Sequence, residues 1–197
     1  GGLYMLVAQA FYASCLFQDK NLNEEQIDCI YHHLVQEKEN IVLIGMPSSG
    51  KTTIGSMLAK RLHKEFIDID ELIKSRIQME ISEYFSKFGE NSFRIVESQV
   101  IEEVSKRTNL VIATGGGVIL KEVNIENLKE NGKIVLLNRS LDNLIATSDR
   151  PLTATKEKLE TCYLERKLLY KKFCDIVIDN NHDLTNAVDE IIERMKI

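Results

Sequence analysis

Cysteine is scarce in this chain, and its pattern excludes two common roles. The four cysteines among 197 residues form no C-x-x-C pair and no metal-ligand spacing. We therefore interpret Cys15, Cys29, Cys162 and Cys174 as buried or incidental thiols of a protein in a reducing compartment, and we expect a cytoplasmic location.

Long apolar runs are also missing. No stretch approaches the roughly 18 apolar residues that a membrane-spanning helix needs. The apolar stretch from Leu3 to Phe17 lacks a basic flank and is interrupted by Gln9, which argues against a signal peptide. We expect no membrane partner.

Basic residues are not in excess. The chain has 25 lysines and arginines against 30 aspartates and glutamates, and a pI near 5.5, which argues against a nucleic-acid partner. This balance allows an anionic substrate, because the local field at a site matters more than net charge. A chain of this length that is 44% hydrophobic and has no repeats fits one domain of ordinary size, or one domain plus an appendage.

One glycine-rich stretch carries the strongest signal. Residues 41–44 predict a short buried strand, and apolar periodicity predicts a helix from Ile54 onward. Between them, residues 45–52 (GMPSSGKT) match G-x-x-x-x-G-K-[ST] in full. Such a P-loop turns backbone N–H groups onto phosphates at the start of a helix, whereas a chance glycine turn would not match all the fixed positions of this eight-residue pattern between a strand and a helix. The residues expected to bind the nucleotide are Gly45, Pro47, Ser48, Ser49, Gly50, Lys51, Thr52 and Thr53.

Strands and helices alternate after this loop. Short apolar strands separated by helices indicate a parallel sheet that is covered on both faces. Ligands of such sheets bind beyond the carboxyl ends of the strands, where the motifs below fall. The expected strands are residues 66–70, 110–113, 134–137 and 176–178, and a last helix is expected over 183–197.

Residues 1–38 do not belong to this pattern. Apolar residues recur at helical spacing from Leu3 to Phe11, and a second helix is expected after an N-cap at Asn23. We interpret this arm as a helical hairpin whose apolar face packs on the rest of the chain or on a second copy. A charged linker places the boundary between domains of residues 1–38 and 39–197.

Two aspartates lie at the end of the second predicted strand. In the strand predicted over residues 66–70, the two-residue period puts Asp68 and Asp70 on one face. A phosphoryl-transfer enzyme needs one carboxylate near Mg²⁺, and a second can orient a substrate hydroxyl and take its proton. A solvated strand end with Asp70 as a helix cap is the alternative.

Arg94 lies three residues before Glu97 in a predicted helix, which is the spacing of a surface ion pair. Alternatively, it presents its planar fork to a substrate carboxylate. After the third strand, Gly115, Gly116 and Gly117 let the backbone approach a ligand closely. A flexible turn is the alternative, although two glycines would have been enough for it.

Two further arginines are candidates. Arg150 opens a polar stretch reaching residue 158 that we interpret as a mobile lid closing on the phosphates, unless Arg150 is a plain loop residue. Arg166, on the following helix, reaches an anionic ligand or pairs with Glu165 or its neighbours.

Taken together, these motifs resemble the shikimate kinases. Their order is P-loop, D-x-D, G-E-x-x-F-R-x-x-E, T-G-G-G, R-P-L and E-R-x-x-x-Y, across residues 40–197. The resemblance implies a three-layer α/β fold of the nucleoside-monophosphate-kinase type, with a five-stranded parallel sheet flanked by helices. It also implies ATP- and Mg²⁺-dependent phosphorylation of the 3-hydroxyl of shikimate in chorismate and aromatic amino-acid biosynthesis.

The same resemblance implies a role for each residue. Lys51 and Thr52 would hold the phosphates and the metal, with Asp68 near Mg²⁺. Asp70 would bind the shikimate hydroxyls and act as the base, and Arg150 would meet the phosphates. The shikimate carboxylate would be held by Arg94 and Arg166, with the backbone of Gly115, Gly116 and Gly117.

One departure from the family concerns adenine. Its members often carry an arginine a few residues before R-P-L that packs on the base, and residues 144–149 contain none. We expect weaker nucleotide selectivity rather than lost activity. Arg139 and residues 180–183 are candidate substitutes.

The arm resembles the C-terminal tail of shikimate dehydrogenases. The matching residues are Gly2, Met5, Leu6, Val7, Gln9, Ala10 and Phe11. In that family the glutamine touches the substrate, but this chain lacks the rest of such a site. Because both resemblances concern consecutive steps of one pathway, we hypothesise that the chain is the C-terminal part of a dehydrogenase–kinase fusion. An unrelated packing or dimerisation arm is the alternative.

Two other functions stay open from the sequence. A related small-molecule kinase, such as a gluconate kinase, would leave Arg94, Arg166 and the three glycines without a common role. A catalytically silent nucleotide-binding module would not need to keep the residues Lys51, Thr52, Asp68 and Asp70.

Overall fold

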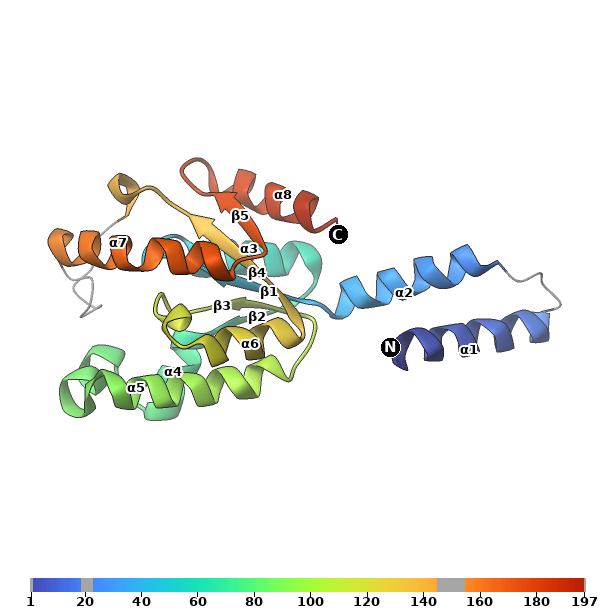
Figure 1. Cartoon of the computed structure of the whole chain (residues 1–197), viewed down its shortest axis with the longest axis horizontal. Helices are drawn as coiled ribbons and strands as arrows, with labels where there is room; N and C mark the ends of the chain where they lie inside the picture. The colour runs from blue at the N-terminus through green and yellow to red at the C-terminus, as the bar shows by residue number, and fades with distance from the viewer. Residues whose placement is uncertain (1, 19–22, 145–154, 197) are drawn as a thin grey trace. The chain divides into compact units, whose positions relative to one another are not determined.

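The computed structural model describes residues 2–18, 23–144 and 155–196 (Figure 1). Contacts divide the chain into two compact units, Gly1–Glu39 and Asn40–Ile197. The elements in chain order are α1 (Gly2–Gln18), α2 (Glu24–Lys38), β1 (Asn40–Ile44), α3 (Lys51–Leu62), β2 (Glu65–Asp68), α4 (Ile69–Ile77), α5 (Ile81–Ser105), β3 (Leu110–Ala113), η1 (Val118–Leu120), α6 (Glu122–Glu130), β4 (Gly132–Asn138), η2 (Leu141–Asn143), α7 (Lys156–Phe173), β5 (Ile176–Asp179) and α8 (Leu184–Met195).

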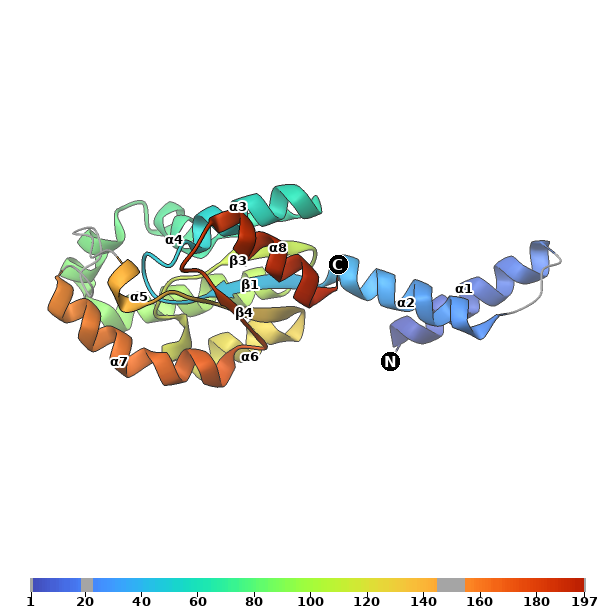
Figure 2. The same cartoon turned by 90° about the horizontal axis from the view of Figure 1, so that it is seen from above.

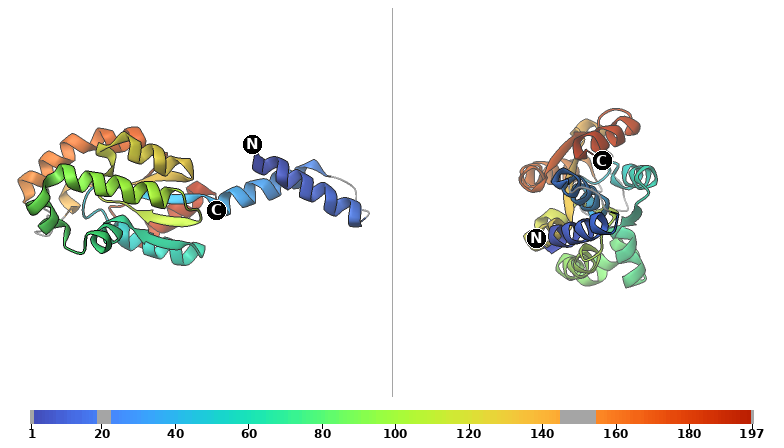
Figure 3. Two further views of the ribbon diagram at one scale, coloured as in Figure 1. Left: turned by 90° about the horizontal axis from the view of Figure 1, so that it is seen from below. Right: turned by 90° about the vertical axis from the view of Figure 1, so that its right-hand side faces the viewer.

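The first unit is a hairpin of α1 and α2, which lie side by side in Figure 3. Asn23 caps α2 as predicted, because its side chain accepts a 3.0 Å hydrogen bond from the N–H of Glu25. The two helices bury Val7, Cys15 and Ile27. Most of the remaining apolar surface of α1 is exposed, up to 91% at Phe17.

Within the described ranges, none of the helices has the length and apolar character needed to cross a membrane.

The second unit is built on a five-stranded parallel sheet of order β2-β3-β1-β4-β5, which confirms the predicted fold class. β1 lies in the middle, where Ile41 is opposite Val111 of β3 and Lys133 of β4. All residues of β1 and β3 are buried, as expected for a parallel sheet with both faces covered. The loops after β1 and β3 therefore leave the same edge of the sheet as neighbours.

Alternate residues of β1 face two separate cores. Ile41 and Leu43 pack with α3 and α8, whereas Val42 and Ile44 pack in the core that includes α5, α6 and α7. Figure 2 shows these helices around the sheet. Because burying one such side chain contributes about 1.5–3 kcal/mol, the two cores fix the sheet that carries the loops.

The strand predicted over residues 66–70 is wrong at its carboxyl end. β2 stops at Asp68 because that side chain caps α4: its Oδ1 accepts the N–H groups of Asp70 at 3.0 Å and Glu71 at 3.4 Å. Asp70 therefore lies in the first turn of α4, and the two-residue period of a strand does not set its direction.

Two other segments refine the prediction. α5 consists of two helical parts joined at Gly89, whose φ of 78° and ψ of 169° lie in a region that essentially only glycine adopts. α7 begins at Lys156 after an N-cap at Thr155, so residues 156–158 of the expected lid are helical. Arg150 and the start of that lid lie outside the described residues.

Candidate active site

The predicted P-loop forms the strand–loop–helix that its motif requires. Gly45 has a φ of 149°, and a Cβ there would lie 2.7 Å from the carbonyl oxygen of Leu137. Gly50, with a φ of 89°, precedes the first residue of α3. Since the first N–H groups of a helix have no acceptor within it, this loop ends in donors suited to an anion.

Lys51 is folded into the curve of this loop. Its side chain is largely buried, and Nζ donates to the carbonyl oxygens of Gly45 at 3.0 Å and Met46 at 2.8 Å. A third contact joins Nζ to the hydroxyl of Ser49 at 3.4 Å. These acceptors keep a positive charge where the loop would receive phosphates.

Thr52 and Asp68 meet across the loop. Thr52 Oγ1 donates a 2.7 Å hydrogen bond to Asp68 Oδ2, while Oδ1 of the same carboxylate caps α4. Mg²⁺ prefers such oxygen ligands and usually takes only one or two from the protein, keeping several waters. The pair fits a magnesium site of this open kind. Within the described ranges, no three His, Cys, Asp or Glu residues gather into a closed metal site.

Asp70 lies directly over Gly115. A Cβ at that glycine would be 2.7 Å from Asp70 Oδ1 and 3.3 Å from Glu97 Oε1. The missing side chain therefore lets two carboxylates approach the backbone after β3. This close approach needs a glycine, which a flexible turn alone does not explain.

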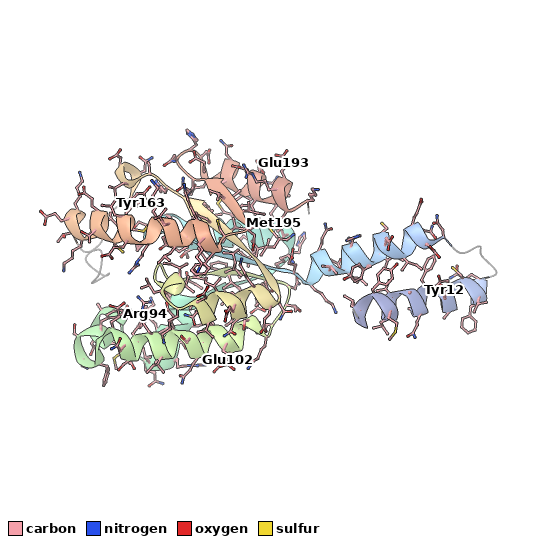
Figure 4. All side chains as sticks on the ribbon, in the orientation of Figure 1. Tyr12, Arg94, Glu102, Tyr163, Glu193 and Met195 are labelled. Carbon is pink, nitrogen blue, oxygen red and sulfur yellow. The ribbon has the colours of Figure 1, made fainter. Side chains whose placement is uncertain are left out.

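Arg94 is a buried arginine shared by two carboxylates. Its Nη1 donates to Glu97 at 2.7 Å, and its Nε and Nη2 donate to Glu90 at 3.2 and 2.9 Å. Only 8% of Arg94 and 1% of Glu97 are exposed, so the interpretation as a surface pair is wrong. Burial raises the pKa of Glu97, although Arg94 favours its charged form. Figure 4 labels Arg94 on α5.

Arg166 and Tyr170 of α7 converge on the backbone of Gly116. Arg166 Nη1 donates to its carbonyl oxygen at 3.1 Å, and the Tyr170 hydroxyl donates to the same oxygen. Burial raises the pKa of Tyr170 above its usual range, so this hydroxyl remains a donor. A Cβ on Gly116 would lie 2.8 Å from Pro47 Cδ, which shows that the triple-glycine loop touches the P-loop.

Most of these groups line one cavity of about 520 Å³, a size typical of small-molecule sites, although Tyr170 does not. Gly45 and Ser49 belong to the P-loop but do not line the cavity. The predicted residues that do are Pro47, Ser48, Gly50, Lys51, Thr52, Thr53, Asp68, Asp70, Arg94, Gly115, Gly116, Gly117 and Arg166. The cavity thus combines a phosphate loop, several carboxylates, Asp68 and Asp70 among them, and two arginines.

Several lining residues are missing from the predicted site. The spacing of Arg94 and Glu97 predicts only an ion pair, although the place of Glu97 in G-E-x-x-F-R-x-x-E could have identified it. Phe93 and Thr114 also belong to quoted motifs, G-E-x-x-F-R-x-x-E and T-G-G-G, whereas the others lie in α4 or in the first part of α5 and its cap, outside any motif. The residues missed are Glu71, Lys74, Glu80, Ile81, Phe85, Phe93, Glu97 and Thr114.

The candidates for adenine contact have different surroundings. Asn180 is buried, and its Nδ2 donates to the carbonyl oxygen of Ser49 at 2.6 Å, behind the P-loop. Asp183 caps α8. Among the described residues, the buried Nε of Arg139 has no hydrogen-bond partner. Adenine contact by these residues stays a prediction.

Comparisons with known proteins agree with this geometry. The family model described as "Shikimate kinase" matches residues 47–196. A protein named "Shikimate kinase" from Clostridium botulinum is 43% identical over 158 residues, which cover 78% of this chain and 95% of that protein.

Solved structures show the same similarity. The structure titled "Shikimate kinase from Acinetobacter baumannii in complex with shikimate" has a TM-score of 0.78 and 31% identity, covering 83% of this chain and 96% of that chain. A gluconokinase from Sinorhizobium meliloti has a TM-score of 0.53 at 17% identity, covering 81% of this chain and 93% of that chain. At such low identity the second similarity shows the fold alone.

Proposed function

Because the chain belongs to the shikimate kinase family, we propose that it transfers the γ-phosphoryl group of ATP to the 3-hydroxyl of shikimate. The products are shikimate 3-phosphate and ADP, within aromatic amino-acid biosynthesis. The observation that carries the proposal is the single cavity in which the P-loop, Asp70 and the arginine pair Arg94 and Arg166 all expose groups.

The arginine pair is assigned to the carboxylate of shikimate. A guanidinium presents parallel N–H donors that match a carboxylate, and two arginines in one cavity supply enough charge to desolvate it. Gly117 supports this assignment because its missing side chain leaves room for the guanidinium of Arg94. The backbone of Gly115, Gly116 and Gly117 would complete this end of the site.

The P-loop is assigned to the phosphates of ATP. Lys51 would exchange its carbonyl acceptors for β- and γ-phosphate oxygens, while the N–H groups at the start of α3 hold the same anion. Thr52 and Asp68 would hold Mg²⁺, which when bound neutralises charge on the phosphates. Arg150, outside the described residues, would close on the phosphates from the lid.

Asp70 is assigned the proton of the acceptor hydroxyl. As the shikimate oxygen forms its bond to the γ-phosphorus, the bond from that phosphorus to the bridging oxygen of ADP breaks. The hydroxyl proton passes to the Asp70 carboxylate. The remaining contributions are positioning and charge stabilisation, because phosphoryl transfer needs no covalent intermediate with the protein.

Coupled measurement of ADP release tests this function directly. The full chain is assayed with ATP and Mg²⁺ in three reactions, containing shikimate, gluconate or no acceptor. We expect ADP release only with shikimate, and a phosphorylated product of the corresponding mass. ADP release without a shikimate requirement would overturn the proposal, and preference for gluconate would favour the kinase class whose member shares the fold.

The arm is assigned to a preceding dehydrogenase. We infer from its resemblance to shikimate dehydrogenase tails that residues 1–38 end such a domain, fused to the kinase. The exposed apolar side chains of α1, such as Leu16 at 84%, support a role in packing on a further surface. The reading frame upstream of Gly1 is the test: a frame that starts at or just before Gly1 would exclude the fusion.

The alternative role of the arm is self-association. If the apolar face of α1 pairs with a second copy, size-exclusion chromatography of the whole chain gives a dimer, and removal of residues 1–38 gives a monomer. If the face packs on the kinase unit, both forms are monomers and the shortened form is less stable. If a fused dehydrogenase domain covers the face, a longer chain that includes this domain is a monomer whose stability does not depend on contact between the arm and the kinase unit.

A further inference from the structure

Arg94 has two carboxylate partners that differ in how firmly they are held. Three of its N–H groups are used, one on Glu97 and two on a single oxygen of Glu90. Glu97 has a side chain only 1% exposed, whereas that of Glu90 is 42% exposed. Glu97 therefore cannot leave without burying an unpaired charge, while Glu90 can turn into water at little cost.

The place of Glu90 in the chain permits this movement. Gly89 breaks α5 at a φ of 78°, so Glu90 begins the second helical part and does not lie in a continuous helix. A Cβ on Gly89 would meet nothing within 4 Å, so the backbone next to Glu90 is open on that side. Rotation about the side-chain bonds of Glu90 moves its carboxylate into water without moving Phe93 and the buried residues that follow it.

A second carboxylate on Arg94 conflicts with binding an anion. Asp70 and Glu97 already stand over the same glycine backbone. A substrate carboxylate would add to this negative charge, and like charges in a buried site repel strongly. Charge balance at Arg94 requires one partner to leave as the substrate arrives.

We propose that Glu90 is a stand-in for the substrate carboxylate, pairing with Arg94 in the empty site and giving it up when substrate binds. The proposal rests on the function assigned above, in which Arg94 holds the carboxylate of the acceptor. It explains why a buried guanidinium is stable in both states: Glu97 is its permanent partner, and Glu90 and the substrate alternate.

Removing the charge of Glu90 should have two opposite effects, one on substrate affinity and one on the stability of the empty protein. Because the substrate must displace Glu90, the apparent affinity is lower than the intrinsic affinity by the fraction of sites in which Glu90 has already left. Removing the charge of Glu90 therefore tightens substrate binding. The same change leaves the empty site with an under-paired guanidinium, so the protein without substrate becomes less stable.

The test uses Glu90→Gln and Glu90→Ala in the full chain. We expect the KM for shikimate to fall about three- to tenfold, with the KM for ATP unchanged. We also expect a lower melting temperature without shikimate, and a difference from the unaltered chain that closes at saturating shikimate. Glu83→Gln is the matched control, because Glu83 lies in the first turn of α5 and pairs only with the exposed Lys87 in the contacts described for it. It should leave both KM values unchanged.

Two results would overturn the proposal. A higher KM for shikimate in the Glu90 variants would mean that Glu90 positions Arg94 while substrate is bound. An unchanged KM would mean that Glu90 does not compete at all. Failure of the proposed function looks different, since the unaltered chain would then release no shikimate-dependent ADP.

Discussion

The guanidinium group of Arg94 lies against the backbone of Gly117, so closely that a Cβ at position 117 would overlap its terminal nitrogens. α5 supplies the arginine, and the loop after β3 supplies the glycine. Arg94 can therefore keep this orientation only because residue 117, in a different part of the chain, has no side chain.

Gly117→Ala should displace Arg94. A shift that costs about 1.4 kcal/mol of carboxylate binding raises the KM for shikimate about tenfold, while ATP binding changes little. Steady-state kinetics with each substrate varied in turn measure the two KM values. Gly2→Ala is the control, because a Cβ there meets nothing within 4 Å. Equal increases in both KM values would mean that the substitution disturbs the whole cavity rather than Arg94.

Arg94→Lys tests the planar fork itself. Lysine keeps a positive charge for the buried Glu97 but cannot offer two parallel N–H groups to a second carboxylate. We expect a shikimate KM raised far more than the KM for ATP. Arg76→Lys, in an exposed pair with Glu103, is the matched control and should change neither. Proportional changes in both KM values at position 94 would show that Arg94 has a structural role only.

Asp70→Asn tests the proposed base. The amide still hydrogen-bonds a hydroxyl but cannot take its proton, so kcat should fall about 100- to 10,000-fold with a much smaller change in the KM for shikimate. Rapid-quench measurement of the first turnover separates the chemical step from product release. If the first turnover keeps its normal rate, Asp70 only orients the substrate.

Local chemistry explains which predictions succeeded. The P-loop was predictable because eight neighbouring residues determine its geometry, and the parallel sheet because its bare apolar strands need cover on both faces. The strand over residues 66–70 was wrong because one side-chain oxygen of Asp68 starts a helix, an interaction that apolar alternation does not encode.

Tertiary burial explains what spacing could not predict. An arginine and a glutamate three residues apart look the same in sequence on a surface or in a core. Arg94 and Glu97 are buried because α5 packs against the sheet and the triple-glycine loop, which only the assembled fold reveals. For the same reason, spacing does not predict that Glu90 shares Arg94 with Glu97.

Asp68→Asn tests the metal assignment. Asparagine caps a helix as well as aspartate, so α4 should still begin at Ile69. The loss of charge beside Thr52 should raise the Mg²⁺ concentration needed for half-maximal activity about 10- to 100-fold. Asp183→Asn makes the same change at the cap of α8 and should not alter the Mg²⁺ requirement. An unaltered Mg²⁺ titration in the Asp68 variant would remove this residue from the metal site.

Glu97→Gln tests, through the pH dependence of stability, how burial beside Arg94 shifts the pKa of Glu97. Burial raises the pKa of Glu97 above its ordinary value of 4.5, so the folded protein holds this proton more tightly than the unfolded chain. The contribution of Glu97 to stability is therefore fully present below pH 4.5 and is lost as pH rises through the folded pKa.

The measurement is the free energy of unfolding by urea at several pH values for both proteins. Because the glutamine does not titrate, the stability of the unaltered chain relative to Glu97→Gln should fall as pH rises from about 4, and then level off. Glu103→Gln, at an exposed carboxylate whose pKa is lowered by Arg76, should give the opposite slope. A relative stability that rises with pH at position 97 would mean that Arg94 outweighs burial and lowers the pKa of Glu97 below its ordinary value.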